Sequence, residues 1–345
     1  MKILRLQPFH LPRFQLHPFQ LQALALCLTL FAGVASADIS PDQHGPIGVM
    51  GDHTHKQGEW MFSYRYMVMD MDGNRDGSSR LAPSEILRSG TGPYAVSPLN
   101  MTMEMHMLGM MYAPSDRYTL MAMIPWQTNK MDHATAVGGR FETESSDLGD
   151  ISLAVLVPFG ESSSWLVGMS APTGDLDQRD QTPMGRAFLP YAMQIGSGTY
   201  NLQLGYTLNK QFDDYSVGAQ VKGNFPLGEN DEDYSVGERY ELSGWFAKRI
   251  GQFSWSVRGT YLRNQNYDGA DPRYAMGLAT NLVPTVDPDL RGGQRFDVGV
   301  GVNWAHPSGI RLALEYQLPA YQRLDGPQLE VDNMLTVGLQ YAPSR

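Results

Sequence analysis

From residue 58 onward, the chain contains segments of about ten residues in which apolar and polar positions alternate. The segment from 213 to 225 has one apolar and one polar parity: Tyr215, Val217, Ala219, Val221 and Phe225 against Ser216, Gln220, Lys222 and Asn224. Successive side chains of a strand point to opposite faces, so each segment predicts a strand with one face toward lipid and the other toward water. The sequence therefore predicts an all-β fold, a transmembrane antiparallel β-barrel.

Twelve segments have this character, and each is expected to form one strand: 58–69, 101–113, 117–126, 148–158, 163–173, 198–210, 213–225, 237–249, 252–264, 293–305, 309–319 and 333–341. The connectors between them alternate in length. The short ones contain turn formers such as Pro114-Ser115-Asp116, whereas the long ones include 70–100 and 320–332. In bacterial barrels short turns face the periplasm and long loops face outside, so an even number of strands with both chain termini on the periplasmic side is expected.

The first 37 residues predict an export signal. Basic residues precede an apolar stretch from Leu21 to Val34 and a small-residue cleavage site, Ala35-Ser36-Ala37. The only cysteine, Cys27, lies inside this stretch, so the exported chain is expected to have no thiol. We expect residues 38–57 to be a periplasmic N-terminal segment or a plug, and residues 58–345 to form a barrel in the bacterial outer membrane, in contact with its lipid.

Charge and hydropathy argue against a nucleic-acid-binding protein and against a protein that crosses the membrane with helices. Loss of the three basic residues Lys2, Arg5 and Arg13 would change the formal net charge of the chain from −10 to −13. This acidic balance argues against a nucleic-acid partner, which would require basic surface. Beyond residue 37, no run approaches the roughly 18 apolar residues of a spanning helix.

Methionine is concentrated in the first part of the barrel. The chain has 20 methionines, and most lie between Met50 and Met131. If Arg65 faces the water-filled lumen, Met61 and Met67, which have the same parity, face the lumen too. In segment 117–126, Met121 and Met123 share one face, opposite the face of Leu120, Ala122 and Ile124. In the segment between them, Glu104 and His106 are expected to point inward because a charge in lipid costs several kcal/mol. The neighbouring methionines Met101, Met103, Met105 and Met107 are then expected to face lipid.

The inward methionines are candidate metal ligands. Thioether sulfur is a soft ligand suited to Cu(I), especially beside an imidazole. Strands lie about 4.8 Å apart, so His106 is expected within reach of one methionine from each neighbouring strand. The candidate set is His106, Met61, Met67, Met121 and Met123 in the lumen, His53 and His55 at the periplasmic mouth, and Met131 and His133 at the outer end. They predict a path for Cu(I) or Ag(I); the alternative is that they only pack, because methionine fills irregular space well.

The sequence Asp72-Gly73-Asn74-Arg75-Asp76-Gly77 matches the first half of a calcium-binding loop. Asp72, Asn74 and Asp76 would supply oxygen ligands. Pro83 stands at position twelve, where a bidentate glutamate is required. A simple turn is therefore the favoured interpretation.

Three short motifs carry a resemblance to a known family. They are Leu148-Gly149-Asp150-Ile151, Pro172-Thr173-Gly174-Asp175 and Gln194-Ile195-Gly196-Ser197-Gly198-Thr199. These stretches resemble the outer-membrane family named for the meta-pathway of phenol degradation, and the methionine-dense N-terminal third resembles a Met/His-rich subset of it. The resemblance implies a barrel with a transport role.

These observations favour a passive or facilitated transporter over an enzyme. Nucleophilic catalysis needs a serine beside an oriented base, and His306 meets Ser308 only in a tight turn. The sharper hypothesis is transport of copper-group metal ions through lumenal Met/His sites. A channel for small aromatic or hydrophobic compounds, implied by the resemblance, is the first alternative, and a non-conducting structural barrel is the second.

Overall fold

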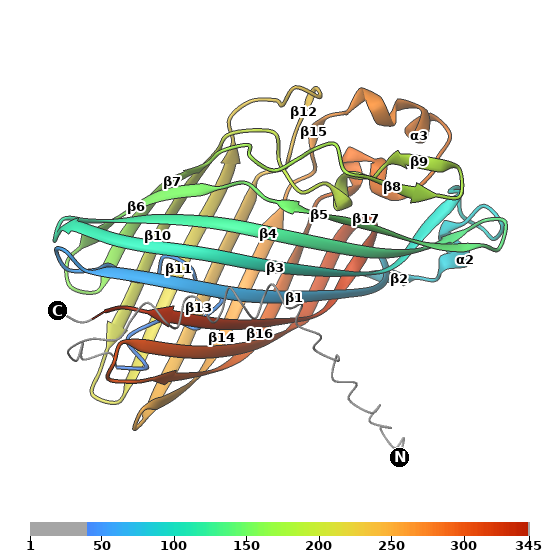
Figure 1. Cartoon of the computed structure of the whole chain (residues 1–345). Helices are drawn as coiled ribbons and strands as arrows, with labels where there is room; N and C mark the ends of the chain where they lie inside the picture. The colour runs from blue at the N-terminus through green and yellow to red at the C-terminus, as the bar shows by residue number, and fades with distance from the viewer. Residues whose placement is uncertain (1–39, 344–345) are drawn as a thin grey trace, which may run out of the picture. The chain divides into compact units, whose positions relative to one another are not determined.

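The computed structural model describes residues 40–343, and these residues build a closed antiparallel β-barrel with short turns at one end and long loops at the other (Figure 1). The predicted signal peptide, residues 1–37, lies outside the described residues. Between residues 40 and 343, no helix has the length and apolar character needed to cross a membrane.

Eleven strands form the ring, each antiparallel to the next. They are β1 (Trp60–Gly77), β3 (Val96–Ser115), β4 (Tyr118–Thr135), β6 (Ser152–Phe159), β7 (Ser163–Ser170), β10 (Asn201–Gln211), β11 (Tyr215–Pro226), β13 (Arg239–Ile250), β14 (Phe253–Asn264), β16 (Gly293–Ala305) and β17 (Ile310–Tyr341). Pairing of β17 with β1 closes the ring. Two more strands extend the sheet outside the ring, β2 (Ser79–Leu81) beside β1 and β5 (Arg140–Leu148) beside β4.

The remaining elements lie in the long loops. They are two small hairpins, β8 (Arg179–Thr182) with β9 (Gly185–Phe188) and β12 (Tyr234–Ser235) with β15 (Asp268–Gly269); two short helices, α2 (Pro83–Ile86) and α3 (Ala275–Ala279); and four 3-10 turns, η1 (Tyr191–Met193), η2 (Pro272–Tyr274), η3 (Pro284–Val286) and η4 (Pro288–Leu290).

The last strand corrects the predicted loop at 320–332, and its two limbs contain the two predicted segments 309–319 and 333–341. Segments 309–319 and 333–341 belong to one continuous strand, β17, because its residues stay hydrogen-bonded to neighbours throughout. Leu324 pairs with both Gly293 of β16 and Gly77 of β1, so β17 turns back on itself just beyond Leu324. One limb therefore runs along β16 and the other along β1. This reversal lets a ring of 11 strands close with every neighbour antiparallel.

The predicted loop 70–100 is also wrong at both ends. β1 continues to Gly77 and β3 begins at Val96, and bulges in β1 absorb the irregular register after Asp70. The calcium-like segment is consequently extended strand, not the expected turn. Its central residue, Asn74, is buried and donates from Nδ2 to the carbonyl of Pro98 at 2.7 Å. Calcium binding by Asp72, Asn74 and Asp76 stays a prediction.

The predicted alternation is confirmed in the second half of the barrel. In β14, Phe253, Trp255 and Val257 are exposed on the outer surface, whereas Ser256 and Arg258 are buried inside. The same division holds along β11, β13, β16 and β17. The outer face is thus an apolar surface suited to lipid, and the inner face is polar and hydrogen-bonded.

The expected facing of β3 is wrong. His106 lies opposite Tyr66 and Trp126, and Leu108 of the same parity is 56% exposed, so Glu104 and His106 are on the outer face. The methionines expected to face lipid, Met101, Met103, Met105 and Met107, are on the inner face instead. The physical reason is that neither side chain has to bring a charge into lipid: a neutral imidazole carries none, and Glu104 lies toward the loop end of β3, which has 20 residues, about twice what a membrane requires.

The N-terminal segment, residues 40–57, lies inside the barrel and is hydrogen-bonded to the inner wall. Gln220 Nε2 donates to the carbonyl of Met50 at 3.0 Å, and Ser254 Oγ donates to that of Pro41 at 2.8 Å. The amide of Gly48 in turn donates to Glu315 Oε2 at 2.9 Å. Strands from several sides of the barrel therefore position this segment.

Candidate functional site

A cavity of about 520 Å³ lies inside the barrel. Its lining divides by chemistry into three parts: a methionine side formed by Met50, Met105, Met107, Met121 and Met123; a charged side formed by Lys222, Arg239 and Glu241; and an aromatic part from the loops formed by Tyr191, Tyr234 and Tyr267. A cavity with one apolar and one polar wall can orient a small amphipathic molecule.

The methionine side extends along the inner faces of β1, β3 and β4. Met61, Met111, Met121 and Met123 are buried together against Leu156 and Leu166, and Met50 and Met107 pack on this cluster. Met67 lies directly opposite Met105 on the same inner face. At the loop end, Met131 is buried with Met101, Leu189 and Met193, and Met71 and Met103 pack against them. The predictions that Met61, Met67, Met121 and Met123 face inward are confirmed.

The predicted site that joins His106 to the inward methionines is not formed. His106 is on the outer face, where the hydroxyl of Tyr64 lies 2.7 Å from its Nδ1 and the ring of Tyr66 packs beside it. His133 is buried, but its ring stacks on Phe141 with centroids 4.6 Å apart. The structure therefore separates His106 from the sulfur donors of the lumen, whereas His133 is buried on the same face of β4 as Met131.

The charged side of the lumen consists of ion pairs. Arg258 and Glu315 form a buried bidentate pair, with Nε–Oε1 at 2.8 Å and Nη2–Oε2 at 3.0 Å. Nearer the loops, Lys222 Nζ lies 3.8 Å from Glu241 Oε1, and Arg239 also contacts this carboxylate at 3.7 Å. At the cavity wall two cations thus share one carboxylate.

The three sequence motifs that carried the family resemblance meet beside the cavity. Asp150 accepts from the amide of Gly174 at 3.0 Å through Oδ1 and from the amide of Ser197 at 3.1 Å through Oδ2. Gly174 and Gly196 lie so close that a Cβ on Gly174 would approach the Gly196 Cα to 2.6 Å. The motifs therefore build one joint that anchors the loop between β7 and β10 to the barrel wall.

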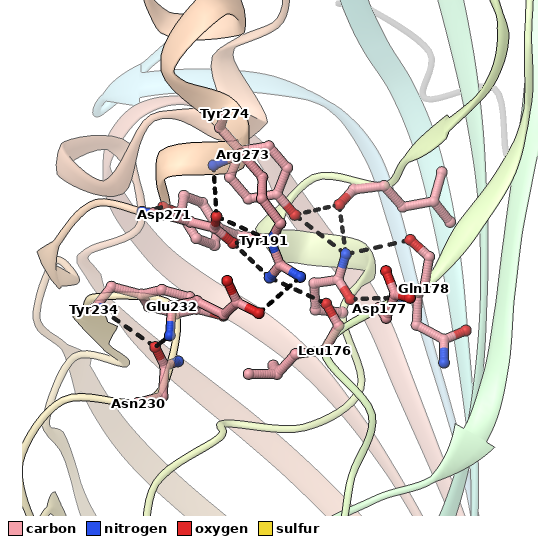
Figure 2. A network of polar contacts seen from close by, with 12 residues as sticks. Leu176, Asp177, Gln178, Tyr191, Asn230, Glu232, Tyr234, Asp271, Arg273 and Tyr274 are labelled. Atoms are coloured by element: carbon pink, nitrogen blue, oxygen red, sulfur yellow. Dashed lines mark hydrogen bonds and ion pairs between the residues drawn. The ribbon is translucent and has the colours of Figure 1, made fainter.

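Three loops cover the cavity at the outer end, and Figure 2 shows the polar contacts that join them. Arg273 is the central residue: its guanidinium pairs with Asp271 at 2.6 Å and with Glu232 at 3.0 Å, and it donates to the carbonyl of Leu176 at 3.3 Å. These partners come from the segments that follow β7, β11 and β14. We call this loop cluster the roof, defined by residues 171–200, 227–238 and 265–292.

Tyrosine rings fill the inside of the roof. Tyr191 makes edge-to-face contacts with Tyr234, Tyr267 and Tyr274, with centroids 4.8–5.2 Å apart. The Tyr191 hydroxyl accepts from the amide of Asp271 at 2.8 Å, and burial raises the pKa of Tyr191 to about 12. The roof is therefore held by aromatic packing as well as by charge, and sequence reasoning did not identify it.

The N-terminal segment places a second group of titratable residues within the lumen. His44 Nδ1 lies 3.2 Å from His53 Nδ1, which lies 2.8 Å from Asp52 Oδ1. His55 is adjacent, with its ring centroid 4.9 Å from that of His53. Burial, with the nearby His53, lowers the pKa of His55 to about 3 and that of His44 well below its ordinary value. His53 and His55 were predicted ligands; His44, nine residues before His53, was missed.

Fold and lumen together define the class: an outer-membrane β-barrel of the channel type. Residues 87–318 match the family described as "Putative MetA-pathway of phenol degradation", and the chain belongs to this family. A similar solved structure is the COG4313 outer membrane channel from Pseudomonas putida F1, with 13% identity, a TM-score of 0.59, and coverage of 85% of this chain and 99% of that one.

Other solved barrels are less similar. The TodX deltaS2S3 mutant monoaromatic hydrocarbon channel has 10% identity and a TM-score of 0.45 over 84% of this chain and 91% of that one. The translocator domain of the autotransporter NalP from Neisseria meningitidis has 11% identity and a TM-score of 0.48 over 84% and 90%. No curated protein matches the chain in sequence.

Proposed function

We propose that this barrel is a channel for small aromatic or other mainly apolar molecules. The observation that carries the proposal is the cavity, in which Met50, Met105, Met107, Met121 and Met123 replace the polar side chains found elsewhere on the inner wall. A methionine-lined wall does not stabilise hydrated ions or other polar solutes. An apolar solute, in contrast, is stabilised by about 25 cal/mol for each Å² of its apolar surface that is buried against such a wall. The family description, which refers to phenol degradation, supports the same class of solute.

The opposite wall supplies a polar contact. Lys222 and Arg239 share the carboxylate of Glu241, so this wall can hydrogen-bond a hydroxyl or other polar substituent while the ring lies against methionine. Methionine is flexible and polarizable, and its sulfur contacts aromatic rings favourably. The cavity thereby suits a range of small aromatic shapes better than a single one.

The proposal is tested by the paired substitution Met107→Gln with Met123→Gln. Glutamine has nearly the length of methionine, so the change removes apolar character without closing the cavity. We expect uptake of a radiolabelled monoaromatic compound by a porin-deficient Gram-negative host to fall about tenfold, the equivalent of about 1.4 kcal/mol. Single-channel conductance for KCl is expected to be unchanged.

Met184→Gln is the matched control, because Met184 is 80% exposed in the β8–β9 turn. It makes the same chemical change away from the cavity and is expected to leave uptake unchanged. Equal uptake by the wild type, the control and the paired variant would refute a methionine-lined path for apolar solutes.

A path for Cu(I) or Ag(I) is a second proposal, supported by the buried thioethers of Met61, Met111, Met121 and Met123 in one cluster. Thioether groups alone can hold these soft ions. It predicts that the barrel competes with a chromophoric Cu(I) chelator under anaerobic conditions and that Met121→Gln with Met123→Gln abolishes the competition. Absence of competition by the wild type would rule out this path.

A further inference from the structure

The N-terminal segment brings His44, Asp52 and His53 to one point inside the barrel. A turn in which the amide of Val49 donates to the carbonyl of Pro46 at 2.8 Å reverses the chain, and Gly51, with φ of 68°, supplies a second bend. One ligand atom from each of the three side chains lies within 4.8 Å of the other two. Two imidazole nitrogens and a carboxylate thus converge on a small volume.

The spacing suits a tetrahedral metal ion. Bonds of about 2.0–2.1 Å in tetrahedral geometry separate two ligand atoms by about 3.3 Å. The Nδ1 atoms of His44 and His53 are 3.2 Å apart; Oδ1 of Asp52 lies 2.8 Å from His53 Nδ1, and Oδ2 of Asp52 lies 3.9 Å from His44 Nδ1. Changes of about half an ångström in the two Asp52 distances would complete the geometry.

The hydrogen bonding also favours a cation at this point. Two neutral imidazoles that face each other through Nδ1 cannot both donate, so at least one nitrogen lone pair faces the other ring and the Asp52 carboxylate. In addition, His55 Nε2 is buried without a hydrogen-bond partner among residues 40–343 and belongs to the ring beside His53. His55 is thus a further imidazole beside His53, outside the group of three.

The donor set selects the metal. Imidazole nitrogen and carboxylate oxygen suit Zn²⁺, whereas the soft ions Cu(I) and Ag(I) prefer the sulfurs of the lumen wall. The positive charge of Arg311, which donates to the carbonyl of Gly45 at 2.8 Å, weakens the site relative to one with several carboxylates. Reversible binding is the consequence.

We propose that His44, Asp52 and His53 bind Zn²⁺ and that the bound ion locks the N-terminal segment inside the barrel. The ion would tie residue 44 to residues 52 and 53, which closes the chain around Ile47, Gly48 and Val49. Ile47 is buried against Gly338 of β17, and Gly48 donates to Glu315, so this closed loop is the part of the segment that contacts the charged wall. The locking role rests on the proposed channel function.

The site is tested by Zn²⁺ titration of the refolded, tag-free barrel against a chromophoric chelator. We expect one ion per chain, and we expect His44→Ala with His53→Ala to abolish it. His306→Ala is the control, because His306 lies exposed in the β16–β17 turn. Heat-modifiable mobility on a gel shows that each variant has folded, and Asp52→Asn, which preserves size, is expected to weaken binding as a second variant. Unchanged binding in the double histidine variant would overturn the site.

The lock is tested separately with Zn²⁺ and the same proteins in planar bilayers. Addition of Zn²⁺ is expected to lower KCl conductance of the wild type, to slow hydrogen exchange of residues 40–57, and to change neither in the histidine variant. Stoichiometric binding with unaltered conductance and exchange would overturn the lock. Uptake of the aromatic compound by metal-free protein tests the channel itself, so failure of one proposal is distinguishable from failure of the other.

Discussion

At the scale of single residues, Gly48 shows how closely the N-terminal segment fits the barrel wall. A Cβ at this position would come within 2.2 Å of Arg258 Nη2 and 2.5 Å of Glu315 Oε2. We therefore expect Gly48→Ala to push the segment away from the buried ion pair, at a cost of about 1–3 kcal/mol for an overpacked contact. The measurable result is a higher KCl conductance in planar bilayers and faster proteolysis of residues 40–57.

Gly244→Ala provides the comparison for this substitution. Gly244 is a glycine of strand β13, and a Cβ there would meet only the carbonyl oxygen of Gly218, at 3.8 Å. Conductance and proteolysis of this variant should match those of the wild type. If Gly48→Ala behaves in the same way, the segment does not obstruct the lumen at this point.

Residue chemistry determined which site predictions held. Arg65 correctly indicated that Met61 and Met67 face inward, because Arg65 lies in the part of β1 that crosses the lipid. The same rule failed for His106, because a neutral imidazole carries no charge into lipid, and its Nδ1 lies 2.7 Å from the Tyr64 hydroxyl on the outer face. His44 was missed because no local period links it to His53; only the turn formers between them, among them Pro46 and Gly51, signal that the chain folds back.

At the scale of whole elements, the facing of β3 gives a direct test in lipid. The only cysteine of the chain is Cys27, inside the predicted signal, so single cysteines in the exported barrel can be labelled cleanly. We expect a fluorophore attached through His106→Cys to be quenched by brominated lipids, as at Leu108→Cys, whereas one attached through Met105→Cys is protected. Stronger quenching at 105 than at 106 would show that the facing is reversed.

The alternating pattern predicts the parts of the strands that cross the membrane, but not how far the strands extend beyond it. Alternation located every strand of the ring, since each needs one apolar and one polar face whatever its neighbours do. It did not locate the outer halves of β1 and β4, the first residues of β3 or the bend in β17, because strands beyond the lipid pair through backbone hydrogen bonds and tolerate polar residues on both faces. The roof has no periodic signal, since its contacts join loops distant in sequence.

At the scale of the whole molecule, two parts of the chain follow one another along the lumen, the N-terminal segment and the roof, and we expect both to hinder passage. Arg273 links three loops of the roof, so Arg273→Ala should loosen the outer barrier, as Gly48→Ala should loosen the inner one. Resistances in series add: if the two are comparable, removal of either raises conductance at most about twofold, whereas removal of both raises it far more. Arg117→Ala, in the exposed β3–β4 turn, is the control. Planar-bilayer recordings of the two single variants and the double variant distinguish this arrangement from parallel paths, for which the two increases in conductance would simply add.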